Sequence, residues 1–226
     1  MQLHRRLIAA IVPGLALLAG AVPAQAKIIE LGNAAQVAPT CPTSPCLAVS
    51  RTTGYQVKLG AKRGEFTEPA TGRIVAWTIA LGNPNAKQTA FFDKGYGEAS
   101  AGISVLRPGK RLFSRVVGQS PVMKLAPYFG QTVQFPLDTA IPVSKGQVIA
   151  LTVPTWAPAL TQLMDDGSSW RASRAKGACD DTETQTAQTK LRSLTQYRCL
   201  YRARLTYSAT LITTPTPNKA PAQPKT

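Results

Sequence analysis

The sequence contains almost no histidine: the only one among 226 residues is His4. Cysteine is also scarce, with 4 residues and no Cys-x-x-Cys pair. Because His4 precedes a predicted cleavage site, the mature chain would have no imidazole for a Ser-His-Asp or Cys-His catalytic arrangement, or for a histidine-bearing zinc site. The sequence therefore predicts no metal site, no cofactor and no enzyme activity.

Acidic side chains are few as well. The chain has 11 Asp and Glu against 26 Lys and Arg, which gives a net charge of +15. A glycosidase needs two carboxyl groups facing each other across a cleft, whereas most acids here fall in predicted loops and turns. The excess of scattered positive charge favours an anionic partner, such as an acidic polysaccharide or a wall polymer.

Residues 1–26 have the pattern of a secretory signal peptide. Arg5 and Arg6 precede an apolar run over residues 7–22, and the small-x-small sequence at 24–26 suits cleavage. Removal of both arginines leaves 24 basic and 11 acidic residues, a net charge of about +13. No later segment reaches the roughly 18 apolar residues of a membrane span. We expect a secreted protein, free or held non-covalently at the cell envelope, and its compartment disfavours nucleic acid as a partner. The general and twin-arginine export routes both stay open.

An even number of cysteines in an exported chain predicts two disulfides. Sequence proximity favours Cys41–Cys46 and Cys179–Cys199 among the three possible connectivities. The second bond would close a loop of about 20 residues, which the chain-entropy model values at about 3 kcal/mol.

The hydrophobic pattern of the remaining chain has a period of two. It is clearest over residues 200–212, where Tyr, Ala and Leu alternate with Arg, Thr and Ser, as in a half-buried strand of an antiparallel sheet. Residues 73–81 are almost continuously apolar and predict a central strand covered on both faces. Further strands are predicted at 54–59, 88–92, 101–107, 111–117, 131–135 and 147–153, with 101–117 as a hairpin and with no helix.

These strands predict one all-β domain over residues 47–212, an antiparallel β-sandwich of jelly-roll type. We expect residues 27–46 to be an irregular lead-in. The Pro- and Thr-rich segment 213–226 is typical of a disordered tail, because it has no large apolar side chain. Two long loops, at 154–177 and 180–197, interrupt the strand pattern.

Four stretches, in the order GRIVAWTIALG, ISVLRPG, IPVSKGQVIALTVP and RARLTYSATLI, give the chain a family resemblance. It resembles a group of uncharacterised secreted β-sandwich proteins of high-GC Gram-positive bacteria over about residues 50–212. Because these are strand and turn motifs, the resemblance implies a jelly-roll-like fold and export. It implies no catalytic residue.

Aromatic residues in the first long loop form the candidate ligand site. Trp156 and Trp170 lie near Asp165, Asp166 and Arg171. An exposed indole beside carboxylates and a guanidinium offers a sugar ring an apolar face and polar partners. The alternative is that both tryptophans pack at the edge of the sandwich.

The sequence therefore predicts a non-enzymatic protein that binds carbohydrate or an anionic wall polymer. Two other functions stay open. A structural or assembly module of the envelope would have buried tryptophans and an exposed apolar patch, and a carboxylate glycosidase would have two facing acids. A calcium site shared by the acids at 165–166 and 180–183 also stays open, although their spacing matches no known calcium loop.

Overall fold

The computed structural model describes residues 25–33, 38–162, 167–181 and 184–215. Within them, Ala26–Thr214 belong to one compact unit. Most of the predicted leader, Asp165, Asp166 and the predicted tail beyond residue 215 lie outside the described residues. The leader and the tail therefore stay predictions.

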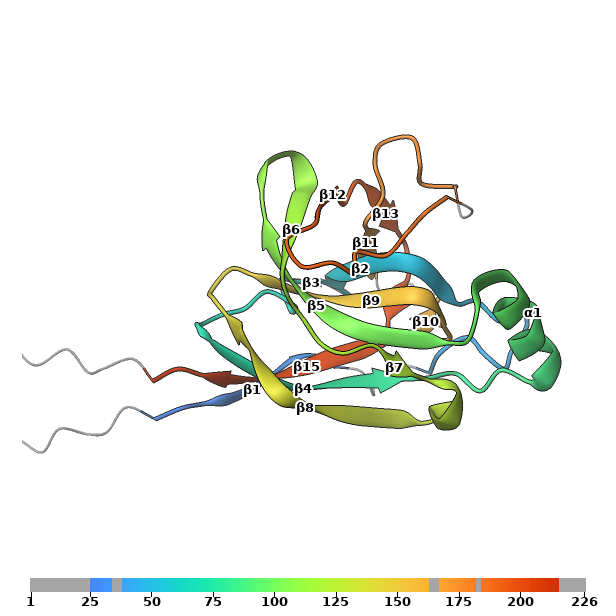
Figure 1. Cartoon of the computed structure of the whole chain (residues 1–226), viewed down its shortest axis with the longest axis horizontal. Helices are drawn as coiled ribbons and strands as arrows, with labels where there is room; N and C mark the ends of the chain where they lie inside the picture. Colours follow the sequence, from blue (N-terminus) through green and yellow to red (C-terminus); the bar gives the residue numbers. More distant parts are fainter. Residues whose placement is uncertain (1–24, 34–37, 163–166, 182–183, 216–226) are drawn as a thin grey trace, which may run out of the picture. The chain divides into compact units, whose positions relative to one another are not determined.

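Two antiparallel sheets make up the compact unit (Figure 1). The small sheet has the strand order β1 (Ile28–Gly32), β15 (Tyr207–Thr213), β4 (Gly72–Ala80) and β8 (Thr132–Val143). The large sheet has the order β12 (Leu194–Gln196), β6 (Phe113–Gln119), β5 (Ser100–Pro108), β9 (Val148–Ala157), β2 (Val49–Leu59), β11 (Ser169–Ala172) and β13 (Cys199–Tyr201).

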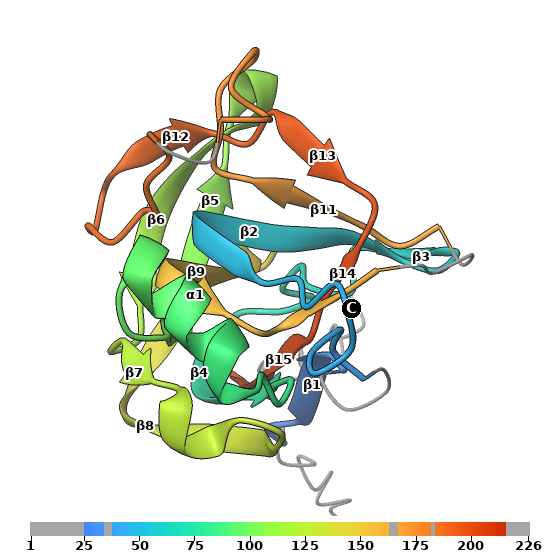
Figure 2. The ribbon, with the colours of Figure 1, turned by 90° about the vertical axis from the view of Figure 1, so that its right-hand side faces the viewer.

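Shorter elements complete the fold. They are β3 (Lys62–Arg63) beside β2, β7 (Met123–Lys124) beside β5, the pair β10 (Leu160–Thr161) and β14 (Arg204–Leu205), the helix α1 (Ala86–Tyr96), and the 3-10 turns η2 (Lys110–Leu112) and η3 (Ala126–Tyr128). Figure 2, which is turned by 90° from the view of Figure 1, shows α1 in front of the open end of the sandwich.

The chain alternates between the two sheets. It runs from β2 in the large sheet to β4 in the small one, back to β5 and β6, across to β8, back to β9, and ends in β15 of the small sheet. The predicted hairpin at 101–117 is the β5–β6 pair. These crossings confirm the predicted all-β antiparallel sandwich.

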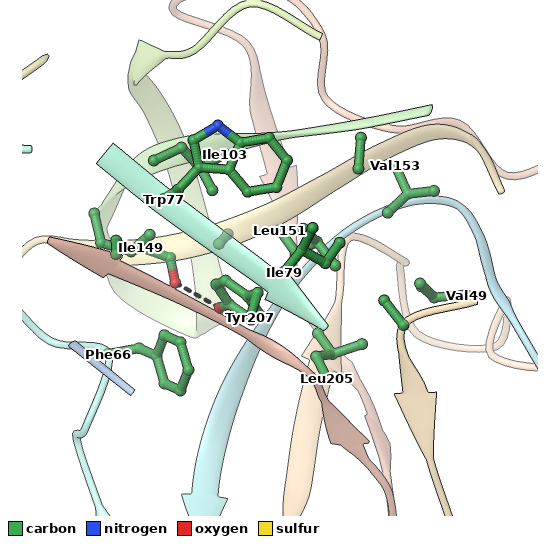
Figure 3. Close-up of a cluster of buried hydrophobic side chains, with 14 of the residues drawn as sticks. Val49, Phe66, Trp77, Ile79, Ile103, Ile149, Leu151, Val153, Leu205 and Tyr207 are labelled. Atoms are coloured by element: carbon green, nitrogen blue, oxygen red, sulfur yellow. Dashed lines mark hydrogen bonds between the residues drawn. The ribbon is translucent and has the colours of Figure 1, made fainter. Parts of the chain in front are cut away.

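The apolar core fills the space between the sheets (Figure 3). From the small sheet, Trp77 and Tyr207 are fully buried. They meet the alternate side chains of β9, of which Ile149 and Leu151 have exposed fractions of 0% and 1%. The Tyr207 hydroxyl donates a hydrogen bond of 2.9 Å to the Ile149 carbonyl oxygen, so this buried phenol has its partner inside the core.

The strand β4 shows why its sequence is so apolar. A bulge between Ile74 and Ala76 shifts the register against both neighbouring strands, so alternation is interrupted. Both residues are buried, while Val75 and Thr78 are only half-buried. The strand is central as predicted, but its outer face is not fully covered.

The predicted strand at 88–92 is wrong, because these residues belong to α1. Asn85 begins the helix: its side chain accepts from the Gln88 backbone N–H at 3.0 Å, and the Gln88 side chain accepts from the Asn85 backbone N–H at 2.9 Å. This reciprocal capping box stabilises a helix start. It was present in the sequence as Asn-x-x-Gln, although the helix lacks buried residues among those described.

Two further segments differ from expectation at their ends. The lead-in 27–46 is not irregular throughout, because β1 pairs residue by residue with β15. The single strand predicted over 200–212 is divided into β13, β14 and β15. The chain leaves the large sheet after β13, pairs with β10 through β14 and then enters the small sheet, so no single strand could span this path.

Glu68 is a buried carboxyl without a hydrogen-bond partner among the described residues. Its exposed fraction is 1%, and both carboxyl oxygens are unpaired. Backbone hydrogen bonds to Gln147 and from Gly146, of 2.8 and 2.9 Å, fix it beside the turn before β9. Burial raises the pKa of Glu68 to about 8, because desolvation disfavours the charged form.

Because Glu68 is buried, we predict that the mature protein loses stability as pH rises from about 5 to 8. Over that range Glu68 is ionised in the unfolded chain and stays protonated in the folded one. The free energy of unfolding therefore falls with rising pH, by roughly 2–4 kcal/mol over the range. No histidine of the mature chain titrates in this pH range, because His4 is the only histidine of the sequence. Urea denaturation at several pH values measures the slope, which Glu68→Gln should flatten. Glu65→Gln, at an exposed position, is the control, and a flat wild-type profile contradicts the prediction.

Candidate functional site

Trp156 lies on β9 and is fully buried. Its indole stacks on Phe92 of α1, with ring centroids 4.7 Å apart and an interplanar angle of 21°. Its Nε1 donates a hydrogen bond of 2.8 Å to Oδ1 of Asp93. The side chain therefore anchors α1 to the large sheet, and its ring faces are covered.

Trp170 lies on β11 with an exposed fraction of 5%. It packs against Tyr201 of β13, with ring centroids 5.0 Å apart. Its ring also lies over Gly54, where an added Cβ would come within 2.6 Å of the indole. Glycine is needed here because the ring occupies the space of a side chain.

The predicted site residues do not form one aromatic platform. Trp156 and Trp170 pair with Ser50 and Gln56 of β2, positions about 20 Å apart along a strand. The Arg171 guanidinium donates to the carbonyl oxygens of Tyr197 and Arg198, at 3.2 and 3.0 Å. Asp165 and Asp166 lie outside the described residues. Since both indoles are buried, neither presents a face on which a sugar ring can stack.

A polar layer covers the outer face of the large sheet instead. The inward residues of β9 are apolar, but its outward Thr152 receives a hydrogen bond of 3.2 Å from Thr53 of β2 and lies 2.6 Å from the hydroxyl of Ser104 of β5. All three side chains are buried. Buried hydroxyls need partners, so this face requires a cover that supplies polar groups.

The cover is the segment between β11 and β13. The Gln188 backbone N–H donates to Thr53 Oγ1 at 2.9 Å, and Gln119 Nε2 donates to the Gln188 carbonyl oxygen at 2.7 Å. The buried Tyr197 hydroxyl donates to Gln188 Oε1. Burial raises the pKa of Tyr197 well above its usual value, so this phenol stays a neutral donor.

Both predicted disulfides are present, and one of them lies at this cover. Cys179 and Cys199 are bonded, with Cα atoms 5.3 Å apart, and Cys41 and Cys46 are bonded, with Cα atoms 4.5 Å apart. The first of these bonds ties the cover to β13. Arg174 strengthens the same junction, because its Nη1 donates to the Cys179 carbonyl oxygen at 2.9 Å and its guanidinium carbon lies 5.2 Å from the Tyr201 ring centroid.

A polar hollow of about 520 Å³ lies within this cover. We define the polar hollow by the amide, hydroxyl and charged side chains that line it, chiefly Ser173, Gln185, Gln188, Lys190, Ser193 and Thr195. One carboxylate, Asp181, also lines it. The hollow offers neutral donors and acceptors, with few charges.

Gln185 is the notable residue of the polar hollow. Its exposed fraction is 8%, yet neither its amide oxygen nor its amide nitrogen has a hydrogen-bond partner among the described residues. A buried amide without partners costs about 1–3 kcal/mol for each unpaired group. A ligand that presents adjacent donor and acceptor groups would recover this cost once the buried amide turns toward the hollow that Gln185 lines.

The described residues form no group of three or more metal-ligating side chains. No helix in this part of the chain has the length and hydropathy of a membrane span. Lys124 and Glu98 form an ion pair, with Nζ and Oε2 2.8 Å apart. Most cations of the described surface therefore have no carboxylate beside them.

Comparisons with models of protein families, with curated proteins and with solved structures found no match. Sequence reasoning missed Gln185 and Gln188, although a signal was present: the segment 182–189, between the paired cysteines, is rich in Thr and Gln.

We predict that the Cys179–Cys199 bond maintains the polar hollow. Replacing both cysteines by Ala should lower the free energy of unfolding by about 3 kcal/mol and increase hydrogen exchange at backbone amides over 184–196. The matched control is the double Ala variant of Cys41 and Cys46. It should cost about 2 kcal/mol because its loop is shorter, and it should leave that exchange unchanged. Equal exchange in the two variants would contradict the assignment.

Proposed function

We propose that the mature chain is exported and binds a polyhydroxylated, anionic wall polymer without catalysis. The leader pattern and the two disulfides support export, since disulfides persist in oxidising compartments. The polar hollow supports the polymer, because its amides and hydroxyls are the groups that hydrogen-bond sugar hydroxyls.

The observation that carries the proposal is the unpaired amide of Gln185 in the polar hollow. Its oxygen accepts and its nitrogen donates, which matches two neighbouring hydroxyls of a sugar or polyol. Lys190 lines the same hollow and is exposed, so an anionic group on the polymer finds a cation at its rim. In this proposal Gln185 and Lys190 take the place of Trp156 and Trp170, the residues that the sequence predicted to bind the sugar.

The charge of the chain supports the anionic character of the ligand. With 26 basic and 11 acidic residues, the chain has too few acidic groups to neutralise its positive potential. Such a surface attracts polyanions and raises their association rates, and the effect weakens as salt screens it.

We predict that Gln185→Ala weakens binding of the mature protein to wall polysaccharide at least about tenfold, equivalent to about 1.4 kcal/mol. The loss follows from removing both hydrogen bonds of the amide. Gln131→Ala, at an exposed turn position, is the matched control and should bind normally. Pull-down on purified wall polymer followed by calorimetry measures the affinities. Equal affinities of the two variants would remove the polar hollow from the proposal.

A second candidate function is docking to another envelope protein. Phe113 and Leu194 favour it, because their exposed fractions are 38% and 50% and they lie on the adjacent strands β6 and β12. The buried tryptophans also agree with such a module. The double variant Phe113→Ser, Leu194→Ser distinguishes the candidates. It should leave polymer binding unchanged if the polar hollow is the site, and it should abolish binding to an envelope protein if this apolar face is the docking surface.

A further inference from the structure

Two arginines from different sheets line a second hollow, of about 420 Å³. Arg73 comes from β4 of the small sheet and Arg107 from β5 of the large sheet. We propose that this arginine hollow is an anion subsite that binds one oxyanion, a phosphodiester or carboxylate group, of the polymer. The inference rests on the proposed function and names the group that gives it anion preference.

The charges in the arginine hollow all have one sign. Its other lining groups are uncharged, with hydroxyls from Thr71, Ser144 and Thr214, and no carboxylate lines it. Neither Arg73 nor Arg107 has a hydrogen bond or ion pair with any described residue. A guanidinium binds an oxyanion through two parallel N–H donors, and both arginines keep all their donors available.

The strand pairing beside the hollow places like charges together. Arg107 lies directly opposite Arg115 in the β5–β6 pair, an arrangement that destabilises a sheet unless the charges are satisfied. The Arg115 guanidinium donates a hydrogen bond of 2.7 Å to the Arg192 carbonyl oxygen. Arg107 has no such partner, so a bound anion would relieve the repulsion.

The backbone under the arginine hollow is fixed by close packing. Arg73 pairs with Pro142 on one side and Ile212 on the other, so its strand cannot shift alone. At Gly72, an added Cβ would come within 2.2 Å of the Ile212 carbonyl oxygen. A site on a rigid strand is preorganised and loses little entropy on binding.

A third hollow, of about 410 Å³, lies beside the arginine hollow, with which it shares Val117 and Pro142. It has no lining residue in common with the polar hollow, and the carboxylate of Asp138 lines it. The two arginines of the arginine hollow therefore carry the anion subsite by themselves.

The test uses the mature protein and four probes: poly(glycerol phosphate), polygalacturonate, a neutral dextran and phosphatidylglycerol vesicles. We expect Arg73→Gln, Arg107→Gln to weaken binding of an anionic polymer at least tenfold and to flatten its salt dependence, with dextran binding unchanged. Arg202→Gln, at an exposed arginine outside every hollow described above, is the matched control. Which anionic polymer binds distinguishes phosphodiester from carboxylate.

The outcomes separate the subsite from the proposed function. If the double arginine variant binds anionic polymers like Arg202→Gln, the anion subsite is wrong, while a loss with Gln185→Ala still supports the polar hollow. If Gln185→Ala has no effect on any polymer but the arginine variant does, the polar hollow fails and the anion subsite stands alone. Binding to the vesicles only would overturn both. Circular dichroism and thermal unfolding confirm that each variant folds.

Discussion

The large sheet must be covered on both faces, and this constraint shapes the rest of the molecule. Its inner face is apolar and packs on Trp77 and Tyr207 of the small sheet. Its outer face carries hydroxyls such as Thr152, which are buried although they cannot drive burial by themselves. A polar segment tied by a disulfide therefore covers them, because only amides and hydroxyls can satisfy such a layer. The polar hollow lies within that covering segment.

The sheet architecture was predictable because strand periodicity reports burial. The β5–β6 hairpin, the central position of β4 and both disulfides follow from alternation, turn residues and cysteine spacing. The helix α1 was missed because its stabilisation is local, in the capping of Asn85 by Gln88, and because its residues show no apolar stripe. A short capped helix at the end of the sandwich has little hydrophobic signal for sequence reasoning to detect.

The candidate site was harder to predict because sequence does not report exposure. Trp156 and Trp170 lie where a loop was expected, but both are on strands and buried. The ring of Trp170 needs a glycine beneath it, and this is Gly54, on a strand more than 100 residues earlier in the chain. Gln185 is informative for the opposite reason: its type is ordinary, and only the folded chain shows that it is buried without partners.

Charge and hydrogen bonding have different roles in the proposed recognition. Long-range attraction by unpaired cations such as Arg73 and Arg107 brings a polyanion to the surface but discriminates poorly among polyanions. Buried neutral groups act only at contact, and they reject ligands that leave them unpaired. The proposed recognition requires these two kinds of groups to hold a ligand, and it requires no chemical step. In the proposal these two kinds of groups lie in separate hollows, so affinity for polyanions and selectivity among them come from different parts of the chain.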